Sequence, residues 1–249
     1  MNVSGQKVTD DKPAFRQLEA VIVCDNYSDF LEVTIPHTLR NVNKLVVVTS
    51  KTDGDTKKLC AKLDVTCIEG WNHRRDGFDK ARAINHGLAH LSCKNYLLHM
   101  DADVIIPDVF ADWFTTSHIL KPENIYGVDR YECKSQKSLD EVFKTGWVHA
   151  RKEWRYMIQP PYNLKPSTRV AHSDYEGWLP IGYFQLWHGS QQTRYPLKRD
   201  ADAEHTDVLF AANWMPENRI LIPDFYAIHL STDDGVGANW HGRKTPKWK

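Results

Sequence analysis

The first hundred residues alternate between short apolar runs and longer segments whose apolar residues recur at helical spacing. The runs LEAVIVC, KLVVVT, VTCI and YLLHM, at 18–24, 44–49, 65–68 and 96–100, are apolar on both faces and predict strands. The segments between them predict helices at 29–41, 56–63 and 78–91. Strands buried on both faces and alternating with helices are typical of a mostly parallel sheet covered by helices on both sides. The pattern therefore predicts an α/β, Rossmann-like fold.

The boundaries of the first helix carry two further signals. Ser28 is a residue type that can cap a helix running towards Asn41. Pro36 lacks a backbone N–H and should kink this helix or mark its true end.

The second half of the chain is less regular. The run ILIPDFYAIH at 220–229 predicts a strand, and apolar residues after Thr206 predict a short helix. With 249 residues, of which 41% are hydrophobic, the chain is long enough for one large domain with an elaborated second half.

Composition excludes little but points to a neutral, soluble protein. Lys plus Arg and Asp plus Glu both number 32, so no global charge favours nucleic acid or membrane. The polar start of the chain lacks the apolar core of a signal peptide, and no later run is long enough to span a bilayer. Five scattered cysteines without a C-x-x-C pair fit reduced thiols. We therefore expect a cytoplasmic location.

The stretch YLLHMDADVIIP at 96–107 places two carboxylates, Asp101 and Asp103, at the end of a predicted buried strand. Residues two apart on a strand project to the same side, so the two like charges need a positive partner. Asp is also common in turns and at helix N-caps. Because ligands of such sheets bind beyond the carboxyl ends of the strands, a site is expected here.

The chain lacks the usual glycine-rich phosphate loops. After the first strand the sequence is CDNYSDF, and no G-x-x-x-x-G-K-[ST] is present. The glycines of GVGANWHG at 235–242 have no strand-turn-helix context and suggest a mobile loop. A nucleotide would therefore be held by a divalent cation that bridges carboxylates and phosphate oxygens.

The order of these elements, the helix motif K-A-x-A-x-N-x-G at 80–87 and the strand ending in Asp-Ala-Asp resemble GT-A fold glycosyltransferases, especially glycosyltransferase family 2. The resemblance implies one domain. Residues 18–107 would form its nucleotide-sugar-binding half, and 108–249 its acceptor-binding half with a C-terminal lid. It also implies a hexosyl or pentosyl transferase that uses Mn²⁺ or Mg²⁺ and a nucleotide sugar, with UDP-sugars preferred.

The resemblance also assigns donor-site residues. Asp101 would lie near the ribose or the metal, Asp103 would ligate the metal, and His229 would be a further ligand, although a histidine that ends an apolar run is also typical of a core. The second histidine usual in the family is missing, and His241 lies too far along the chain to be assumed its substitute. In the family, an acidic residue after the second strand recognises the base of the nucleotide. In the run TSKTDGD a lysine stands at that position, and Asp53 is the nearest acidic substitute.

Three more residues belong to the expected donor site. Asp25 is a second candidate for the nucleoside, although it equally suits a turn. Lys80 and Arg82 are positioned to neutralise the diphosphate, or to be solvated on a helix face.

An inverting member of the family uses a carboxylate at a helix start as the base that takes the acceptor's proton. In DADAEHTDVLFAANW, Asp207 falls in the first turn of the predicted helix, and Glu204 and Asp202 are alternatives. A carboxylate at a helix start is also simply favourable electrostatically.

The acceptor is the least defined partner. Basic and aromatic residues are interleaved between 144 and 199, including Arg151, Lys152 and Arg155, and the chain ends in further cations. Aromatic rings stack on sugars and on bases. A glycan or small hydroxyl acceptor is expected, with a hydroxylated base in nucleic acid as the alternative. A third interpretation is that these basic side chains are solvated and balance acidic residues elsewhere in the neutral chain. A nucleotidyltransferase would want a glycine-rich loop, and a non-catalytic sugar- or nucleic-acid-binding module with the same fold is the non-enzyme alternative.

Overall fold

The computed structural model describes residues 16–71, 78–146, 164–167, 177–197, 203, 205–232, 243 and 246–248, with only the backbone at 71, 164–167 and 224. Within these residues no helix is long and apolar enough to cross a bilayer.

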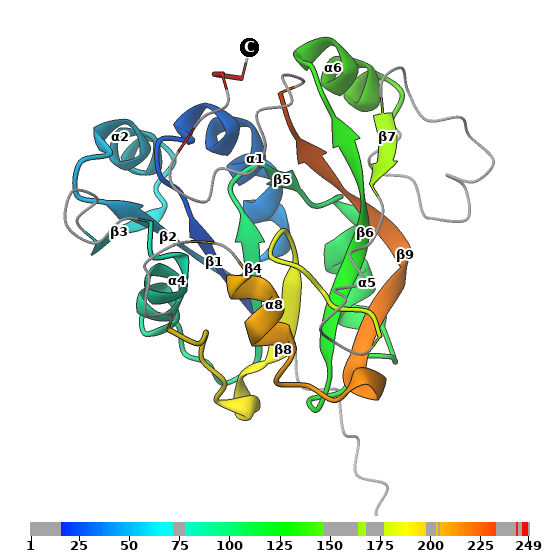
Figure 1. The fold of residues 1–249 in the computed structure, drawn as a ribbon. Helices are drawn as coiled ribbons and strands as arrows, with labels where there is room; N and C mark the ends of the chain where they lie inside the picture. The colour runs from blue at the N-terminus through cyan, green and yellow to red at the C-terminus, as the bar shows by residue number, and fades with distance from the viewer. Residues whose placement is uncertain are drawn as a thin grey trace, which may run out of the picture.

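The first half of the chain alternates strands and helices as the hydrophobic pattern predicts (Figure 1). Its elements are β1 Leu18–Val23, α1 Ser28–Asn41, β2 Lys44–Ser50, α2 Gly54–Lys62, β3 Thr66–Trp71, α4 Lys80–Leu88 and β4 Tyr96–Asp101. The prediction of α4 is too long, because Asp79 caps the helix by accepting from the backbone N–H of Arg82 and the helix ends before Ala89.

The first helix corrects its predicted cap and one of the two predictions for Pro36, while a kink at Pro36 stays a prediction. Ser28 is its first residue and not its cap, since the N-cap is Tyr27. Pro36 lies inside α1, which continues to Asn41, so the proline does not mark the helix end.

The second half adds strands of both directions. Its elements are β5 Val104–Ile105, α5 Val109–Thr116, β6 Ile125–Cys133, α6 Gln136–Lys144, β7 Leu164–Ser167, β8 Gln185–His188, α8 Thr206–Ala211 and β9 Arg219–Leu230, with short 3₁₀ turns at Gly189–Gln191 and Pro216–Asn218. The predicted helix start at Thr206 and the predicted strand over 220–229 are confirmed.

The described strands form one sheet in the order β3-β2-β1-β4-β8-β6-β9-β5, and β7 pairs with β6. Strands β3, β2, β1 and β4 are all parallel, whereas β8 runs antiparallel to both β4 and β6. Strand β8, which comes late in the sequence, thus separates the parallel part of the sheet from β6 and β9.

Helices cover both faces of the sheet. Leu31 of α1, Leu59 of α2 and Phe110 of α5 belong to the core cluster that contains Ala20 and Ile22 of β1. Ile84 of α4 and Phe210 of α8 belong to the cluster that contains Val21 and Val23. In Figure 1, α8 lies in front of β4 and β8, and α1 and α5 lie behind the sheet. The expected α/β sheet flanked by helices is confirmed.

Two strand pairings, of β1 with β4 and of β5 with β9, bring residues that are distant in the sequence to one end of the sheet. Val23 at the end of β1 pairs with Asp101 at the end of β4, so the two strands end at the same edge. Val104 of β5 pairs with His229 of β9, and the backbone N–H of Leu230 donates to the carbonyl oxygen of Asp103 at 2.8 Å. The backbone alone therefore places His229 beside the two aspartates.

Candidate functional site

The predicted aspartate pair lies where β4 ends and the chain turns into β5. Asp101 is the last residue of β4, and Asp103 lies in the turn before Val104. Their side chains are 32% and 20% exposed, so both are partly withdrawn from water but reachable. Partly desolvated carboxylates this close are costly unless positive charge compensates them.

Lys80 supplies positive charge to Asp101. It is the first residue of α4, and its Nζ donates to Oδ1 of Asp101 at 2.5 Å. The lysine side chain is only 14% exposed. Of the two expectations for Lys80, a solvated side chain is wrong. Its contact with a diphosphate stays a prediction.

His229 approaches Asp103 from β9. Its Nε2 lies 3.5 Å from Oδ2 of Asp103, and its side chain is 18% exposed. Within the described residues, the buried Oδ1 of Asp103 and the buried Nδ1 of His229 have no hydrogen-bond partner. Buried polar atoms are rarely left unpaired, so these two atoms have capacity for a further partner.

The carboxylate and imidazole groups of this site are suitable ligands for a divalent cation. Carboxylate oxygens suit Mg²⁺ and Mn²⁺, and imidazole is an accepted ligand of transition metals. In the part of the chain that the structure describes, no three His, Cys, Asp or Glu side chains are arranged as a ready metal cluster. Lys80 engages Asp101 instead, so a metal that used both aspartates would have to draw Asp101 away from this ammonium group.

The charges of this group are strongly coupled. Burial and the neighbouring Asp103 raise the pKa of Asp101 although Lys80 opposes them. Burial would also raise the pKa of Asp103, but the contact with His229 holds it below its ordinary value. Burial would lower the pKa of Lys80, and the charges of Asp101 and Asp207 reverse that shift, so the ammonium form is stabilised.

Asp207 lies in the first turn of α8. Its Oδ2 accepts the backbone N–H of Gly182 at 2.5 Å. A Cβ atom built on Gly182 would lie 3.2 Å from both Asp207 Oδ2 and Lys80 Nζ. The glycine therefore marks a narrow space in which Lys80 and Asp207 converge, beside Asp101.

A buried polar network fixes the start of α8. Tyr195 Oη donates to Gln185 Oε1 at 2.6 Å and lies 3.1 Å from Nδ1 of His99. The amide Nε2 of Gln185 donates to the carbonyl oxygens of Asp207 at 3.0 Å and Pro180 at 2.8 Å. His99 and Gln185 are fully buried, so this network ties β4 and β8 to the backbone of Asp207.

The two candidates for the nucleoside lie beside each other but have structural partners. Asp53 is the N-cap of α2, where Thr56 N–H donates to Oδ1, and Asn26 N–H and Thr56 Oγ1 donate to Oδ2. Asp25 accepts from Ser50 Oγ at 2.6 Å. Both are buried, with exposures of 6% for Asp25 and 3% for Asp53, and both already accept hydrogen bonds from the protein. Their role in binding stays a prediction.

Arg82 is more exposed than Lys80 and has a local partner. Its Nε lies 3.1 Å from Oδ2 of Asp79, the cap of its own helix, and its side chain is 55% exposed. The structure does not bring Arg82 into contact with Asp101 or Asp103.

Several predicted residues lie outside the described residues. They are Asp202, Glu204, His241, the glycines of 235–242 and the basic residues Arg151, Lys152 and Arg155.

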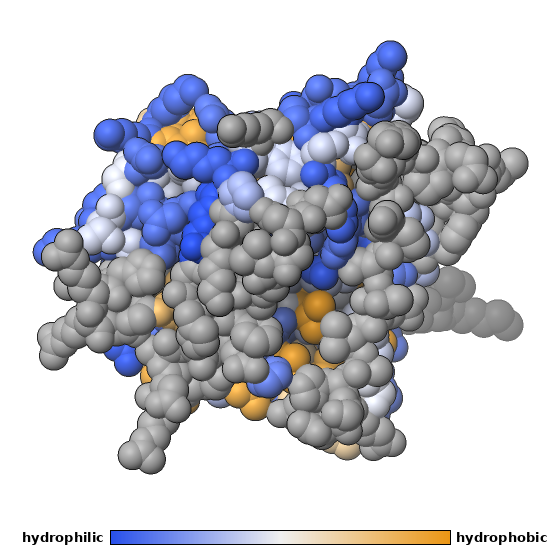
Figure 2. Space-filling model, turned by 45° about the horizontal axis from the view of Figure 1, so that its top comes forward, coloured by the Kyte–Doolittle hydropathy of each residue, from blue (hydrophilic) through white to orange (hydrophobic). Residues whose placement is uncertain are grey.

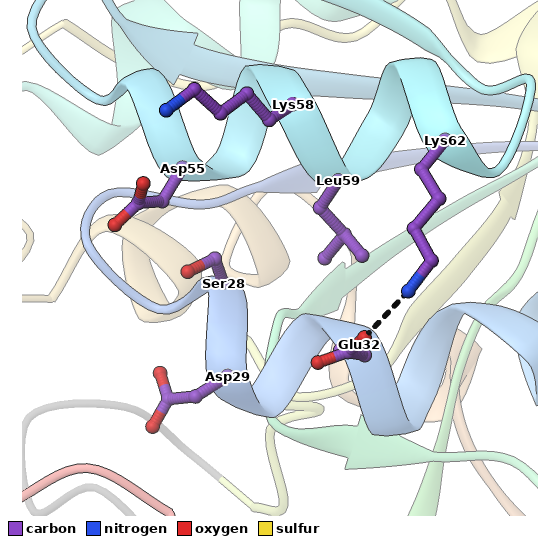
Figure 3. Close-up of a pocket in the computed structure, with 7 residues that line it drawn as sticks. All are labelled: Ser28, Asp29, Glu32, Asp55, Lys58, Leu59 and Lys62. Atoms are coloured by element: carbon purple, nitrogen blue, oxygen red, sulfur yellow. Dashed lines mark hydrogen bonds and ion pairs between the residues drawn. The ribbon is translucent and has the colours of Figure 1, made fainter.

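A surface pocket of about 310 Å³ lies between α1 and α2 and is lined by charged residues, including Asp29, Glu32 and Lys62 (Figure 3). Lys62 and Glu32 form an ion pair across it at 3.1 Å. None of the candidate site residues lines this pocket. Among the coloured residues, hydrophilic side chains predominate in the upper part of the face in Figure 2.

Gly182, Gln185, His99 and Tyr195 are the described site residues that the sequence interpretation missed. The only local signal was a glycine within the apolar run LPIGYFQLW at 179–187, which is typical of a close backbone approach.

The fold is similar to solved structures of low sequence identity. One is a mannosyltransferase from Pyrobaculum calidifontis in complex with GDP-Man and Mn²⁺, with a TM-score of 0.56, 16% identity, and coverage of 93% of this chain and 62% of that chain. Another is S. aureus TarS 1–349, with a TM-score of 0.54, 8% identity, and coverage of 87% and 60%. TarS 1–349 in complex with UDP-GlcNAc gives a TM-score of 0.52, 10% identity, and coverage of 87% and 59%.

The chain thus spans about three fifths of the length of these structures. No family model matches it, and no curated protein matches it. The structural likeness establishes that the chain has the GT-A fold, as the resemblance of its motifs implied.

Proposed function

We propose that the protein is a metal-dependent, inverting glycosyltransferase that moves a sugar from a nucleoside-diphosphate sugar to an acceptor hydroxyl. The observation that carries this proposal is the convergence, at the carboxyl end of β4, of Asp101, Asp103 and His229 with Lys80 and Asp207. Each of these side chains comes from a different element or turn. The GT-A fold also supports the proposal that the protein transfers a sugar.

Asp103 and His229 would hold Mn²⁺ or Mg²⁺, with Asp101 as the additional carboxylate. A bound divalent cation would stabilise the negative charge that develops on the leaving diphosphate. Lys80 adds a fixed positive charge beside Asp101, where the protein excludes much of the solvent. With the positive charges of the metal and Lys80, the group of carboxylates would attract the anionic diphosphate instead of repelling it.

Asp207 would act as the general base. The N–H of Gly182 fixes its Oδ2, and its Oδ1 makes no hydrogen bond within the described residues, which leaves one oxygen for the proton of an acceptor hydroxyl. Gln185 orients the same residue through its backbone carbonyl. One hydrogen bond therefore holds the carboxylate, and a second holds the backbone of Asp207.

The donor is proposed to be a UDP- or GDP-sugar. The similar mannosyltransferase structure contains GDP-Man and Mn²⁺, and a TarS structure contains UDP-GlcNAc, which supports a sugar linked to a nucleoside diphosphate. Asp25 and Asp53 lie at the end of β1 and the start of α2 and are proposed to face the nucleoside. The acceptor is proposed to be a glycan or a small hydroxyl compound.

Calorimetry with UDP and GDP tests the metal-dependent donor site. We expect binding with Mn²⁺ and none with EDTA or in Asp103→Ala, whereas Glu32→Gln, which alters the exposed pair with Lys62, should bind as the unchanged protein does. Equal affinity with and without metal would refute the proposed site. Release of nucleoside diphosphate in a screen of nucleotide sugars and acceptors then tests catalysis, because a binding module with the same fold would bind the donor without releasing product.

A further inference from the structure

Lys80 lies at the centre of the acidic site. Its Nζ contacts Asp101 at 2.5 Å, and the position of a Cβ on Gly182 is 3.2 Å from this Nζ and 3.2 Å from Oδ2 of Asp207. Asp103 is two residues from Asp101 and belongs to the same turn. One ammonium group therefore faces carboxylates from β4, from the turn after it and from α8.

The space that admits the lysine is built into the fold. Lys80 is the first residue of α4, and Asp79 before it is held as the helix cap, which fixes where the side chain starts. Gly182 has no side chain, and a Cβ there would press on both Lys80 and Asp207. The lysine side chain is 14% exposed, so it reaches the acidic group through the protein and not through solvent.

Without this cation, partly buried carboxylates would face one another with too little compensating charge. Such groups repel, and removing one partner of a buried charge pair is strongly destabilising because it leaves an uncompensated charge. A divalent cation bound by Asp101 and Asp103 would supply the same kind of compensation. The ammonium group and the metal would then act on the same carboxylate.

We propose that Lys80 is an internal cation that holds Asp101 and Asp207 together when no metal is bound, and that it competes with the divalent cation for Asp101. The metal in this proposal rests on the proposed function above. The role of Lys80 in assembling the carboxylates does not. Lys80 is thus a positioning residue that sets metal affinity and keeps the proposed base beside the proposed donor site.

Two measurements that need no turnover test this role. The first is thermal unfolding in EDTA and in Mn²⁺, and the second is titration of Mn²⁺ alone by calorimetry. Lys80→Met keeps the length of the side chain and removes the charge, and Lys80→Arg keeps the charge. Lys62→Met is the matched control, since Lys62 forms an exposed lysine–carboxylate pair at 3.1 Å with Glu32.

Lys80→Met should unfold several degrees lower in EDTA, and Mn²⁺ should recover more of its stability than it does for the unchanged protein. Its affinity for Mn²⁺ alone should rise on the order of tenfold, because the ammonium group that competes for Asp101 has been removed. Lys80→Arg, which retains the charge, should stay closer to the unchanged protein than Lys80→Met does in both measurements. If Lys80→Met matches Lys62→Met in both measurements, the proposal is wrong.

A double variant keeps the test decisive if Lys80→Met folds poorly. Adding Asp207→Asn removes one carboxylate from the uncompensated group, so Lys80→Met/Asp207→Asn should be more stable in EDTA than Lys80→Met. A double variant that is no more stable than the single variant would overturn the proposal. Absence of Mn²⁺ binding in every variant would instead refute the metal site, while the comparison in EDTA would still decide the role of Lys80.

Discussion

The contact between Arg243 and Asp29 of α1 yields a prediction about the stability of the fold. Arg243 donates from Nη1 to Asp29 Oδ1 at 2.5 Å and from Nη2 to Oδ2 at 2.9 Å. It also donates to the carbonyl oxygen of Asn26 at 2.6 Å and lies over the ring of Tyr27 at 4.6 Å. Asn26 directly follows Asp25, so this arginine supports the loop proposed to face the nucleoside.

The expected cost of Arg243→Met follows from these contacts. Hydrogen bonds to charged groups contribute about 1.5–3 kcal/mol each, and Arg243 makes two with Asp29. Asp29 keeps a third donor, the backbone N–H of Trp248, and methionine keeps part of the contact with the rings. The pair is 12% and 19% exposed, which weakens solvent screening without abolishing it. We therefore expect a loss of about 2 kcal/mol, or about 4–8 °C in the melting temperature of a protein this size.

The same contact predicts a pH dependence. Burial would raise the pKa of Asp29, but the hydrogen bonds and charge of Arg243 hold it below its ordinary value. A carboxyl with a lowered folded pKa contributes stability above its unfolded pKa, about 4, and loses it as the pH falls through the folded value. The difference between Arg243→Met and the unchanged protein should therefore be largest near neutral pH and shrink below about pH 4.

Urea unfolding between pH 3 and pH 7 measures this difference, and Arg40→Met is the matched control. Arg40 pairs with Asp108 at 3.2 Å, with exposures of 57% and 33%, so its loss should cost about 0–1 kcal/mol. An Arg243→Met deficit no larger than that of Arg40→Met, or one that grows towards acid pH, would refute the reasoning.

The hydrophobic pattern was sufficient for the parallel part of the sheet because its signal is local. Strands β1, β2 and β4 are apolar on both faces, and each helix between them carries its own apolar side. The end of β4 at Asp101 follows from the same pattern. Even the role of Asp53 had a local signal, since a helix cap is often an Asp whose side chain accepts from the residue three positions later, here Thr56.

The supports of the site could not be predicted because they depend on long-range pairing. Gly182 and Gln185 reach Asp207 only because β8 inserts antiparallel between β4 and β6. The partner of Lys80 depends on how α4 packs on the sheet, and a helix-face lysine alone does not reveal whether it points into the protein. Sequence pattern thus located the candidate carboxylates but not the groups that hold them in place.

The other predictions concern the proposed catalytic groups. Asp207→Asn should leave donor binding nearly intact and lower turnover by about two to four orders of magnitude, as loss of a general base does, and unchanged turnover would exclude that role. His229→Ala should weaken Mn²⁺-dependent donor binding in calorimetry. An unchanged metal affinity would mean that His229 is a structural residue and not a metal ligand. Gly182→Ala tests the geometry, because its Cβ would lie 3.1 Å from Asp207 Cβ and 3.2 Å from Lys80 Nζ, closer than ordinary contact, so both side chains must move by a few tenths of an ångström. Since a displacement of about 1 Å costs about a hundredfold in rate, we expect turnover to fall roughly threefold to tenfold with donor affinity retained, and a rate equal to that of the unchanged protein would mean that Asp207 is not held in its reactive position by this contact.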